Sequence, residues 1–345
     1  MKVAILGDLH IGIRNSNKFF ISQHKDFFEN QFFPYLKEHN IDTVIQAGDS
    51  LDSRKFIHID TLRAYKELFL NHFTNDISLH MILGNHCIYH TNQSELSLVK
   101  ELSKEYSDNI HLYDEYSTVN FDNTTFDFCP WINKTNKDDY LAKIKGSCSE
   151  FIVGHFEIKK MEMAHGIECT EGLSFADLKG FKTVFSGHFH NDNFKRNIQY
   201  LTTPIQLDWG DYGTNKGFWV FDTETKSYEF IKNNNNIYHR IVYDDTVNKY
   251  DKIDDLSGFV KLIIIKKNDE LMFDRYYEAL SKQEGIQDIQ IINNDVLLTD
   301  VDVSEFETKN NMDVILDFID GYDTKLNKDN LKQHIISIYN ESIIA

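Results

Sequence analysis

Five short segments of the chain each end in side chains that bind metal ions. In every segment a few apolar residues lead to a glycine, and polar residues follow that glycine directly. The five polar tips are Gly7-Asp8-Leu9-His10, Gly48-Asp49-Ser50-Leu51-Asp52, Gly84-Asn85-His86, Gly154-His155 and Gly187-His188-Phe189-His190. Ligands of α/β sheets gather at the carboxyl ends of the strands. We therefore expect the five tips to converge on one cleft.

The spacing within the tips suits a shared centre. Asp8 and His10 are separated by one residue, as are His188 and His190, so each pair lies on one side of a locally extended chain. A glycine before each tip lets the backbone turn sharply without a clash of a Cβ atom.

The donor atoms of the tips belong to carboxylates, imidazoles and one amide, without a thiolate. This mixture of oxygen and nitrogen favours Mn²⁺ or Fe, with Zn²⁺ as an alternative, over a hard-cation Mg²⁺ site or a cysteine-rich Zn²⁺ site. So many ligands exceed what one ion needs. Two ions about 3.5–4 Å apart, bridged by a carboxylate, form the arrangement used for attack on phosphoryl centres. Such ions lower the pKa of bound water and stabilise charge on the phosphoryl oxygens.

Most of the 15 histidines are not assigned to this site. A single histidine in a loop is more often a surface or hydrogen-bonded residue than a ligand, and we interpret His24, His39, His72 and His334 in that way. Asp52 keeps two interpretations, because it could hold a ligand histidine or form the N-cap of the following helix. The ordered set of tips separates the named residues from the rest.

Composition limits the kinds of protein that this chain can be. With 36 basic and 54 acidic residues among 345, the formal charge is −18, and 41% of the residues are hydrophobic. Because clustered cations make phosphate contacts, a nucleic-acid substrate would need metal ions or a partner to neutralise it. No apolar run reaches the roughly 18 residues of a membrane span, and the first residues turn polar too early for a signal peptide. The four cysteines never form a C-x-x-C pair, which favours reduced thiols in a cytoplasmic protein.

The tips require strands that alternate with helices, and the first half of the chain has this βα pattern. Strands are predicted at 3–6, 43–46, 79–83, 151–153 and 183–185. Helices are predicted at about 59–73 and 94–106. A further apolar stripe runs over 21–36, where Pro34 should kink or shorten the helix. The fold class is therefore α/β.

Beyond residue 202 the pattern changes to strands and turns, with a clear strand at 217–222. The run of four asparagines at 233–236 predicts an exposed connection. After it, 259–265, 269–283 and 286–292 predict a strand, a helix and a strand, which suffices for a small second α/β unit.

The last part of the chain combines apolar helix faces with acidic charge. Between residues 295 and 329 ten acids stand against three lysines, a local charge of −7. Two short helices are predicted there, with apolar faces formed by Met312, Ile315, Leu316 and Ile319, and by Leu331, Ile335, Ile338 and Tyr339. Either these helices form a solvated hairpin that packs on its own domain, or they form an arm that docks on a partner.

In this order, the motifs D-x-H, G-D-x-x-D, G-N-H, G-H and G-H-x-H resemble the signature of the calcineurin-like metallophosphoesterase superfamily, over residues 3–190. The resemblance implies an α/β sandwich in which two facing mixed β-sheets are flanked by helices, with a dimetal site at one edge. It also implies the ligands. Asp8, His10 and His190 would hold the first metal, Asp49 would bridge, and Asn85, His155 and His188 would hold the second.

The same resemblance bears on three neighbouring residues. His86 matches the imidazole that acts as general acid for the leaving alkoxide, a role that an ordinary pKa of about 6.5 suits. Asp52 is the second catalytic candidate, although many members of the nuclease branch have a histidine there, whose role does not transfer. Cys87 stands where the family usually has an acid after G-N-H, and we expect an inert thiol.

Local sequence favours one branch of the superfamily. Serine/threonine phosphatases of this class have G-D-x-V-D-R-G and an arginine before G-N-H, whereas this chain has Ser53-Arg54-Lys55 after Asp52 and Leu83 before Gly84. The segments I-L-G-D-L-H-I-G and Q-A-G-D-S-L-D-S-R, and the later 200–204 and 216–218, are similar to the SbcD-like nucleases. These are relatives of the nuclease of the MRN complex and of the recombination endonuclease subunits of large tailed phages.

The similarity to SbcD-like nucleases implies three parts and their partners. Residues 1–235 would form the metallophosphoesterase nuclease domain, 236–295 a DNA-capping domain, and 296–345 a helical arm that docks an SbcC-like SMC-type ATPase. DNA would be the substrate, and two copies of the chain would form a homodimer within a heterotetramer. The expected cofactor is a pair of Mn²⁺ ions, with Mg²⁺, Fe and Zn²⁺ as alternatives.

The sequence therefore predicts a Mn²⁺-dependent DNA exo- or endonuclease, the nuclease subunit of an SbcCD- or MRN-like recombination and repair complex. It would act in the cytoplasm, that of the host if the protein is viral, without a membrane. An alternative is a stand-alone phosphodiesterase for nucleotides or small diesters, in which the arm packs only on its own chain. A third is a non-enzymatic scaffold whose site has decayed, which the intact ligand set disfavours.

Overall fold

The structure is a computed structural model of the 345-residue chain. It describes residues 1–74, 76–90, 96–106, 108–164, 166–247, 249–250, 253, 255–293, 316, 319, 327–328 and 331–335. The chain divides into two compact units. The first consists of Met1–His239, Asp255–Phe259 and Gln283–Asp288, and the second of Arg240–Asp254, Val260–Lys282 and Ile289–Ala345.

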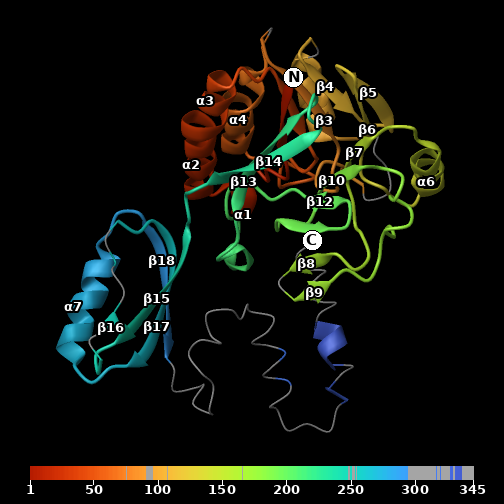
Figure 1. The fold of residues 1–345 in the computed structure, drawn as a ribbon. Coiled ribbons are helices and arrows are strands. Elements are labelled where there is room, and N and C mark those ends of the chain that lie inside the picture. The colour runs from red at the N-terminus through yellow and green to blue at the C-terminus, as the bar shows by residue number, and fades with distance from the viewer. Residues whose placement is uncertain are drawn as a thin grey trace. The chain divides into compact units, whose positions relative to one another are not determined.

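The first unit contains two six-stranded sheets (Figure 1). One has the order β14-β13-β1-β2-β3-β4. Its strands are β1 (Lys2–Leu6), β2 (Thr43–Gln46), β3 (Ser78–Ile82), β4 (Ile110–Tyr113), β13 (Lys216–Asp222) and β14 (Ser227–Asn233). Strands β1 to β4 are parallel, whereas β13 and β14 pair antiparallel with their neighbours. The strands predicted at 3–6, 43–46, 79–83 and 217–222 are all present in this sheet.

The other sheet has the order β11-β12-β10-β7-β6-β5. Its strands are β5 (Ser117–Phe121), β6 (Thr124–Cys129), β7 (Phe151–His155), β10 (Thr183–Gly187), β11 (Asn193–Lys195) and β12 (Ile198–Tyr200). The four central strands are parallel and the two edge strands antiparallel. A small pair, β8 (Glu162–Ala164) with β9 (Ile167–Glu168), and the 3₁₀-helix η4 (Trp209–Asp211) lie outside the sheets. The five strands that carry the polar tips are thus divided between two sheets.

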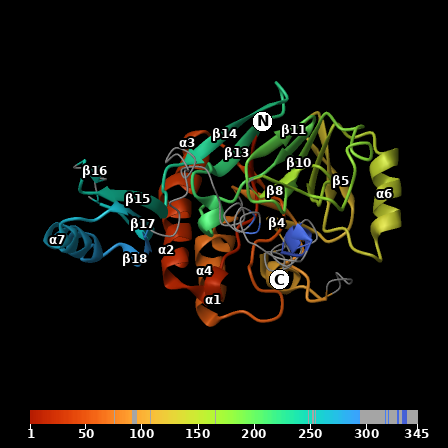
Figure 2. The same ribbon diagram turned by 90° about the horizontal axis from the view of Figure 1, so that it is seen from below.

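Helices cover the outer faces of both sheets, as Figures 1 and 2 show. On the side of β1 lie α2 (Lys18–Phe27), α3 (Phe33–Glu38) and α4 (Ile59–Leu68), the last followed by the 3₁₀-helix η2 (Leu70–His72). The short α5 (Leu98–Ser103) leads into η3 (Lys104–Tyr106), and α6 (Lys137–Gly146) packs on the second sheet. The helices predicted at 59–73 and 94–106 are therefore present in shorter form, each ending in a 3₁₀ turn, and residue 94 lies outside the described residues.

The helical stretch before β2 is divided next to Pro34, as expected. Helix α2 (Lys18–Phe27) continues into the π-helix η1 (Phe28–Phe32), and α3 (Phe33–Glu38) has Pro34 in its first turn. Proline lacks the N–H that an interior helical position must donate, so the first turn is where it fits. Ahead of α2, the short α1 (Ile13–Ser16) contains left-handed backbone at Arg14 and Asn15.

Strand β1 shows how the sheets share their core. Val3 and Ile5 belong to the cluster between the sheets, together with Phe151 of β7. Ala4 and Leu6 belong to the cluster under the helices instead. Successive side chains of a strand point to opposite faces, so β1 is buried on both. The result is the predicted sandwich of two mixed sheets flanked by helices.

The asparagine run at 233–236 is only partly an exposed connection. Asn233 ends β14 and is 2% exposed. Its amide donates to the Pro204 carbonyl at 2.8 Å and its side-chain oxygen accepts from Gln31 at 2.9 Å. The next three asparagines are exposed. The expectation is therefore wrong for Asn233, which joins two distant segments through a buried amide.

The predicted second α/β elements are present. A four-stranded sheet has the order β16-β15-β17-β18, from β15 (Tyr238–Asp244), β16 (Lys249–Tyr250), β17 (Gly258–Lys266) and β18 (Ile286–Asn293). Helix α7 (Glu270–Ser281) begins at an N-cap in which the Asp269 carboxylate accepts from the N–H of Met272 at 3.0 Å. Phe273 and Leu280 are its buried residues. These elements match the strand, helix and strand expected at 259–265, 269–283 and 286–292.

Most of the arm predicted at 296–345 lies outside the described residues, including Met312, Ile315, Ile338 and Tyr339. The capping role of 236–295 and the docking role of the arm stay predictions. Within the described part of the chain, every helix is too short or too polar to cross a membrane.

Candidate metal centre

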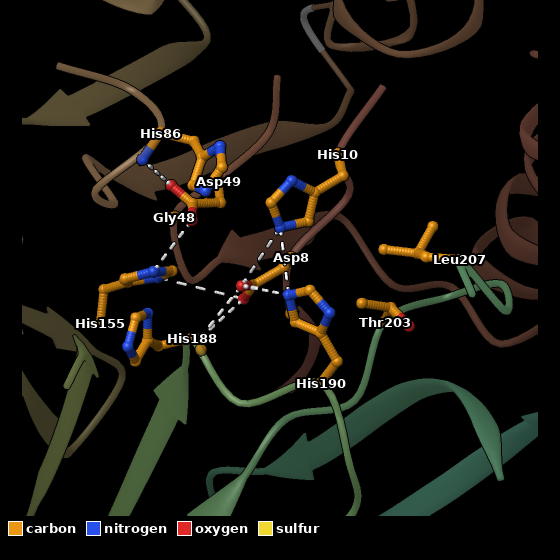
Figure 3. A network of polar contacts seen from close by, with 12 residues as sticks. Asp8, His10, Gly48, Asp49, His86, His155, His188, His190, Thr203 and Leu207 are labelled. Carbon is orange, nitrogen blue, oxygen red and sulfur yellow. Dashed lines mark hydrogen bonds and ion pairs between the residues drawn. The ribbon is translucent and has the colours of Figure 1, made fainter. Parts of the chain in front are cut away.

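The polar tips of all five strands meet in one place (Figure 3). Three tips belong to β1, β2 and β3 of one sheet and two to β7 and β10 of the other, so the site joins the two sheets. The structure brings together all nine predicted residues, which are Asp8, His10, Asp49, Asp52, Asn85, His86, His155, His188 and His190. Their contacts divide into two clusters of donor atoms, described in turn.

Asp8, His10 and His190 form the first cluster. The Nε2 atoms of His10 and His190 are 3.1 Å apart. Oδ2 of Asp8 lies 3.8 Å from Nε2 of His10 and 3.5 Å from Nε2 of His190. Asp8 and His10 are almost fully buried. Two imidazole nitrogens and a carboxylate oxygen therefore face one point, a donor set that suits Mn²⁺, Fe or Zn²⁺.

Asp49, Asn85, His155 and His188 form the second cluster. Oδ1 of Asn85 lies 2.8 Å from Nε2 of His155 and 3.0 Å from Nδ1 of His188. Nε2 of His155 is also 3.1 Å from Oδ2 of Asp49. Donor atoms of Asp8, Asp49 and His155 all lie within 4.8 Å of one another. Asp49 thus stands beside both clusters, where a bridging carboxylate would have to be.

The inward nitrogens are fixed by contacts on the other side of each ring. Nδ1 of His155 donates to the Ala47 carbonyl at 2.9 Å, which leaves the Nε2 lone pair facing the second cluster. Nδ1 of His10 lies 3.2 Å from Oδ1 of Asp52, so its Nε2 faces the first cluster. Metal-binding histidines have such outer partners, which set the tautomer and the ring orientation.

The amide of Asn85 tests whether a cation suits this site. Its oxygen points inward, toward ring nitrogens of His155 and His188 and the carboxylate of Asp49. Hydrogen bonding alone would favour the opposite orientation, in which the amide nitrogen donates to these three groups and the oxygen accepts from Arg54. A divalent cation satisfies converging acceptor atoms with the oxygen inward. The second cluster therefore fits a metal ion.

The pKa values of the site residues also indicate that the two clusters favour a positive charge. Burial alone would raise the pKa of the Asp8 and Asp49 carboxyls, but the adjacent His155 helps to hold both pKa values below their ordinary range. Against the effect of burial, Asp52 and Asp8 raise the pKa of His10 to about 10. Asp49 and Asp8 likewise raise the pKa of His155 to about 9. The carboxylates thus favour a bound cation of some kind, a proton or a metal.

Glycines allow the tips to approach closely. A Cβ atom on Gly84 would lie 2.2 Å from Oδ1 of Asp49, and one on Gly187 would lie 2.4 Å from Oδ1 of Asp8. Of the five tip glycines only Gly48, at φ +95°, has left-handed backbone. The expected turn thus requires glycine at Gly48, whereas close contact requires it at Gly84 and Gly187.

Three residues with side chains also adopt left-handed backbone, His10 at φ 47°, Asp49 at φ 49° and His188 at φ 91°. Such conformations cost on the order of 1–3 kcal/mol each and persist where the surroundings hold them. The N–H of His188 contacts both carboxylate oxygens of Asp8, at 3.0 and 3.1 Å, and the N–H of His10 donates to the Asp49 carbonyl at 2.9 Å. The tips thus hold one another through backbone hydrogen bonds.

His86 borders the first cluster, and its ring lies in a further group of donor atoms with His10 and Asp52. Its backbone N–H donates to Oδ1 of Asp49 and its Nδ1 donates to the Asp52 carbonyl, both at 2.7 Å. Its ring meets that of His10 edge-on, with centroids 4.9 Å apart. Because Nδ1 is committed to a carbonyl, Nε2 is the nitrogen available to exchange a proton. Burial lowers the pKa of His86 below its ordinary value.

Asp52 is a contact of a site histidine and not a helix cap. The N-cap residue of α4 is His58, so the N-cap interpretation is wrong. The carboxylate of Asp52 points to His10 instead, and this contact lowers the pKa of Asp52 in spite of its burial.

Glu157 is a site residue that sequence analysis missed. Its Oε1 lies 3.6 Å from Nε2 of His188, whose Nδ1 faces the second cluster. The contact with His188 lowers the pKa of Glu157. A signal was present, because Glu157 follows His155 at the same i, i+2 spacing that joins Asp8 to His10.

Lys216 was also missed, although it lies in the segment 216–218 that is similar to the SbcD-like nucleases. Its Nζ donates to the His190 carbonyl at 2.8 Å, and Oγ1 of Thr202 donates to the same carbonyl at 2.9 Å. Lys216 is 2% exposed and forms an ion pair with buried Asp211. A lysine buried behind a site loop has no local sequence signal, since lysines are mostly exposed.

Two residues interpreted as structural have structural contacts. His24 is fully buried, and its Nε2 lies 2.7 Å from the carbonyl of Leu9. Burial raises the pKa of the Cys87 thiol to about 12, which keeps it protonated and unreactive. All four cysteines are free thiols, as expected.

Comparison with known proteins identifies the family. The sequence pattern of the family described as calcineurin-like phosphoesterase matches residues 1–192. The chain is 37% identical over 243 residues to Exonuclease subunit 1 of Enterobacteria phage T4, which covers 70% of this chain and 71% of that protein. A solved archaeal phosphodiesterase has 18% identity and a TM-score of 0.34, over 67% of this chain and 99% of that one. From the family match and the phage relative, the chain belongs to the calcineurin-like phosphoesterase family.

Proposed function

We propose that the protein is a metal-dependent nuclease that hydrolyses phosphodiester bonds of DNA. The observation that supports this most is the convergence of donor atoms of Asp8, Asp49 and His155 within 4.8 Å of one another, in a chain of a phosphoesterase family. DNA is favoured over a small diester because the phage relative is named as an exonuclease subunit.

The proposed centre holds two divalent ions. Asp8, His10 and His190 would hold the first, Asn85, His155 and His188 the second, and Asp49 would bridge them. Bound there, the ions would lower the pKa of a water molecule and stabilise the charge that develops on the phosphoryl oxygens. The mixture of nitrogen and oxygen donors favours Mn²⁺, with Fe, Zn²⁺ and Mg²⁺ as alternatives.

The protein's own residues supply the proton and the orientation. His86 would donate a proton from Nε2 to the leaving oxygen, since its Nδ1 is held by the Asp52 carbonyl. The Asp52 carboxylate orients His10 in the first cluster. Asp52 would therefore be a positioning residue, and His86 the catalytic one.

We also propose that the chain works as a subunit of an SbcCD- or MRN-like recombination and repair complex in the cytoplasm. The phage relative is named as a subunit. A net charge of −18 leaves much of the neutralisation of DNA to the ions and to a partner. The partner would be an SbcC-like ATPase docked by the arm at 296–345, with two copies of this chain in a heterotetramer and 236–295 capping the DNA.

Cleavage of linear duplex DNA tests the nuclease proposal. With Mn²⁺ the purified chain should cut the duplex, EDTA should stop the reaction, and a co-encoded ATPase with ATP should accelerate it. Hydrolysis of nucleotides or of methyl p-nitrophenyl phosphate without DNA cleavage in either condition would contradict a nuclease. That result would favour the stand-alone phosphodiesterase.

A double substitution in the full chain tests the arm. Replacing Ile315 and Ile335 by Glu should abolish co-purification with the ATPase and leave the melting temperature unchanged if the arm docks on a partner. If the arm belongs to the chain's own core, the buried charge should instead lower the free energy of unfolding by about 2–7 kcal/mol.

A further inference from the structure

A pocket of about 250 Å³ opens beside the second cluster, within the first compact unit. Its lining includes Trp131, Lys134, Lys137, His155, Glu157 and Glu171. Pockets for drug-sized ligands span roughly 300–1,000 Å³. This smaller pocket suits one unit of a larger substrate, and His155 places it next to the reacting phosphate of the proposed nuclease.

Trp131 connects the pocket with the predicted metal ligands. Its ring centroid lies 5.1 Å from that of His188 and 5.9 Å from that of His155. Its backbone N–H donates to the Leu83 carbonyl at 2.8 Å, which ties it to the chain just before the tip that carries Asn85. The side chain is half-buried. One part of the indole therefore packs on the site histidines while another borders the pocket.

The loop that carries Trp131 is ordered by its own hydrogen bonds. Oδ1 of Asn133 accepts from the N–H groups of Thr135 and Asn136, at 2.9 and 3.3 Å. The Asn136 side chain accepts from the N–H of Asn133 at 2.8 Å and donates to the Trp131 carbonyl at 3.1 Å. A wall that is ordered before binding loses little conformational entropy when a ligand enters.

Two lysines border the pocket. Lys134 and Lys137 are exposed and line it. Further along α6, Lys143 and Lys145 each pair with an aspartate, at 2.8 and 3.4 Å. Among the residues that the structure describes, no carboxylate lies within 4.0 Å of Nζ of Lys134 or Lys137. In a chain with a net charge of −18, these cations are available for a phosphate.

We propose that the pocket is a nucleotide subsite, in which one unpaired base of the strand being cut stacks on Trp131 while Lys134 and Lys137 bind an adjoining phosphate. Stacking on aromatic rings beside cations is how proteins hold single strands without reading their sequence. Glu157 and Glu171 add acceptors to the lining, which suits a base with N–H groups better than a second phosphate. The inference rests on the proposed nuclease function and deepens it.

The subsite has a consequence for the substrate. A base that stacks in this pocket has left the stack of the duplex, and this costs the least free energy at a frayed or single-stranded end. The site therefore favours an unpaired nucleotide next to the bond that is cut.

A strand that lacks one base tests this directly. The wild-type protein with Mn²⁺ cuts one of two end-labelled single strands, a short oligothymidylate or the same oligonucleotide with one abasic unit. A sequencing gel resolves cleavage at every bond. Stacking is worth about 1–3 kcal/mol per base. Cleavage should therefore slow roughly tenfold to hundredfold at one bond beside the abasic unit and stay unchanged at distant bonds.

Substitution of Trp131 should remove this dependence on the base. Trp131→Ala should slow every bond of the intact strand by a similar factor, and the abasic unit should then cause no further local loss. Trp131→Phe, which keeps an aromatic ring, should lie between the two. The matched control is Trp219→Phe, which replaces a tryptophan in the core between the sheets. This variant should show the same local loss of cleavage beside the abasic unit as the wild type. An abasic effect that persists in full in Trp131→Ala would overturn the subsite.

The lysines are tested by salt dependence. For single strands the slope of log affinity against log salt changes by about 0.7 for each phosphate that a cation neutralises. Lys134→Ala with Lys137→Ala should flatten the slope by one to two such steps. Lys143→Ala with Lys145→Ala, two lysines of α6 that do not line this pocket, should leave the slope unchanged. Equal slopes in the two double variants would contradict phosphate binding by Lys134 and Lys137.

These experiments separate the subsite from the function on which it rests. DNA cleavage with equal rates at all bonds of the abasic strand would refute the subsite and leave the nuclease intact. Hydrolysis of methyl p-nitrophenyl phosphate without cleavage of any strand would refute both.

Discussion

The carboxylate of Asp52 lies 3.2 Å from Nδ1 of His10, while the carbonyl of the same residue accepts a hydrogen bond of 2.7 Å from Nδ1 of His86. Asp52 thus holds a proposed metal ligand with its side chain and the proposed proton donor with its backbone. Only the first contact depends on the side chain, so substitution can separate the two.

Asp52→Asn should weaken binding of the first ion. The amide keeps the shape but removes the charge that orients the His10 imidazole, and loss of such a partner typically costs 10–100-fold in metal affinity. Titration with Mn²⁺ followed by calorimetry should show one weakened site and one unchanged site. Asp60→Asn, an exposed acid in the first turn of α4, is the control. Wild-type affinity at both sites of Asp52→Asn would show that the contact does not matter for the metal.

His86→Asn should slow DNA cleavage and leave the metals in place. Loss of a general acid typically costs 10²–10⁴-fold in rate. Methyl p-nitrophenyl phosphate has a leaving group that needs no protonation, so its hydrolysis should suffer far less. Rates on both substrates and elemental analysis check the prediction. If the variant loses an ion, His86 is a ligand and the proposed role is wrong.

Lys216→Met should destabilise the fold behind His190. The side chains of Lys216 and Asp211 are 2% and 5% exposed, so removing one leaves an unpaired buried charge, at a cost of about 3–5 kcal/mol in the free energy of unfolding. Adding Asp211→Asn should restore part of that loss, because the unpaired charge disappears. Urea denaturation of the wild type and of the two variants measures both effects. Wild-type stability in Lys216→Met would contradict a stabilising ion pair.

His80 should make stability depend on pH. Burial, with a smaller effect of His111, lowers the pKa of His80 from 6.5 to about 4. The unfolded chain therefore binds more protons than the native one in this window, so stability falls as pH decreases from 6.5, by roughly 3 kcal/mol at pH 4.

Urea denaturation between pH 7 and 4 measures this slope in matched variants. His80→Phe should lose the contribution of His80. Tyr113→Phe, which removes the hydroxyl 2.7 Å from Nδ1 of His80 but keeps the histidine, should retain it. Equal slopes in wild type and His80→Phe would show that another group is responsible.

The convergence of the tips could be predicted from the sequence because the physical cause is local. Each tip directly follows an apolar run, and parallel neighbours such as β1, β2 and β3 end at the same edge of their sheet. The i, i+2 spacing that joins Asp8 to His10 also joins His155 to Glu157, so Glu157 was within reach of the same local pattern.

Two other supporting groups, Lys216 and Asn233, could not be predicted because their partners come from distant parts of the chain. Lys216 is 26 residues from the His190 carbonyl that it contacts. Asn233 is buried because β14 places its amide beside Pro204, a register that no local pattern contains. The local composition of asparagine predicts a turn and cannot anticipate that pairing.

The number of Mn²⁺ ions per chain tests the central claim most directly. Equilibrium dialysis with elemental analysis should find about two ions in the wild-type protein and almost none in Asp49→Ala, because Asp49 stands beside both clusters. The wild-type sample should cut DNA, and the Asp49→Ala sample should not. A single tightly bound ion in the wild type, or unchanged metal content in Asp49→Ala, would contradict the two-metal account.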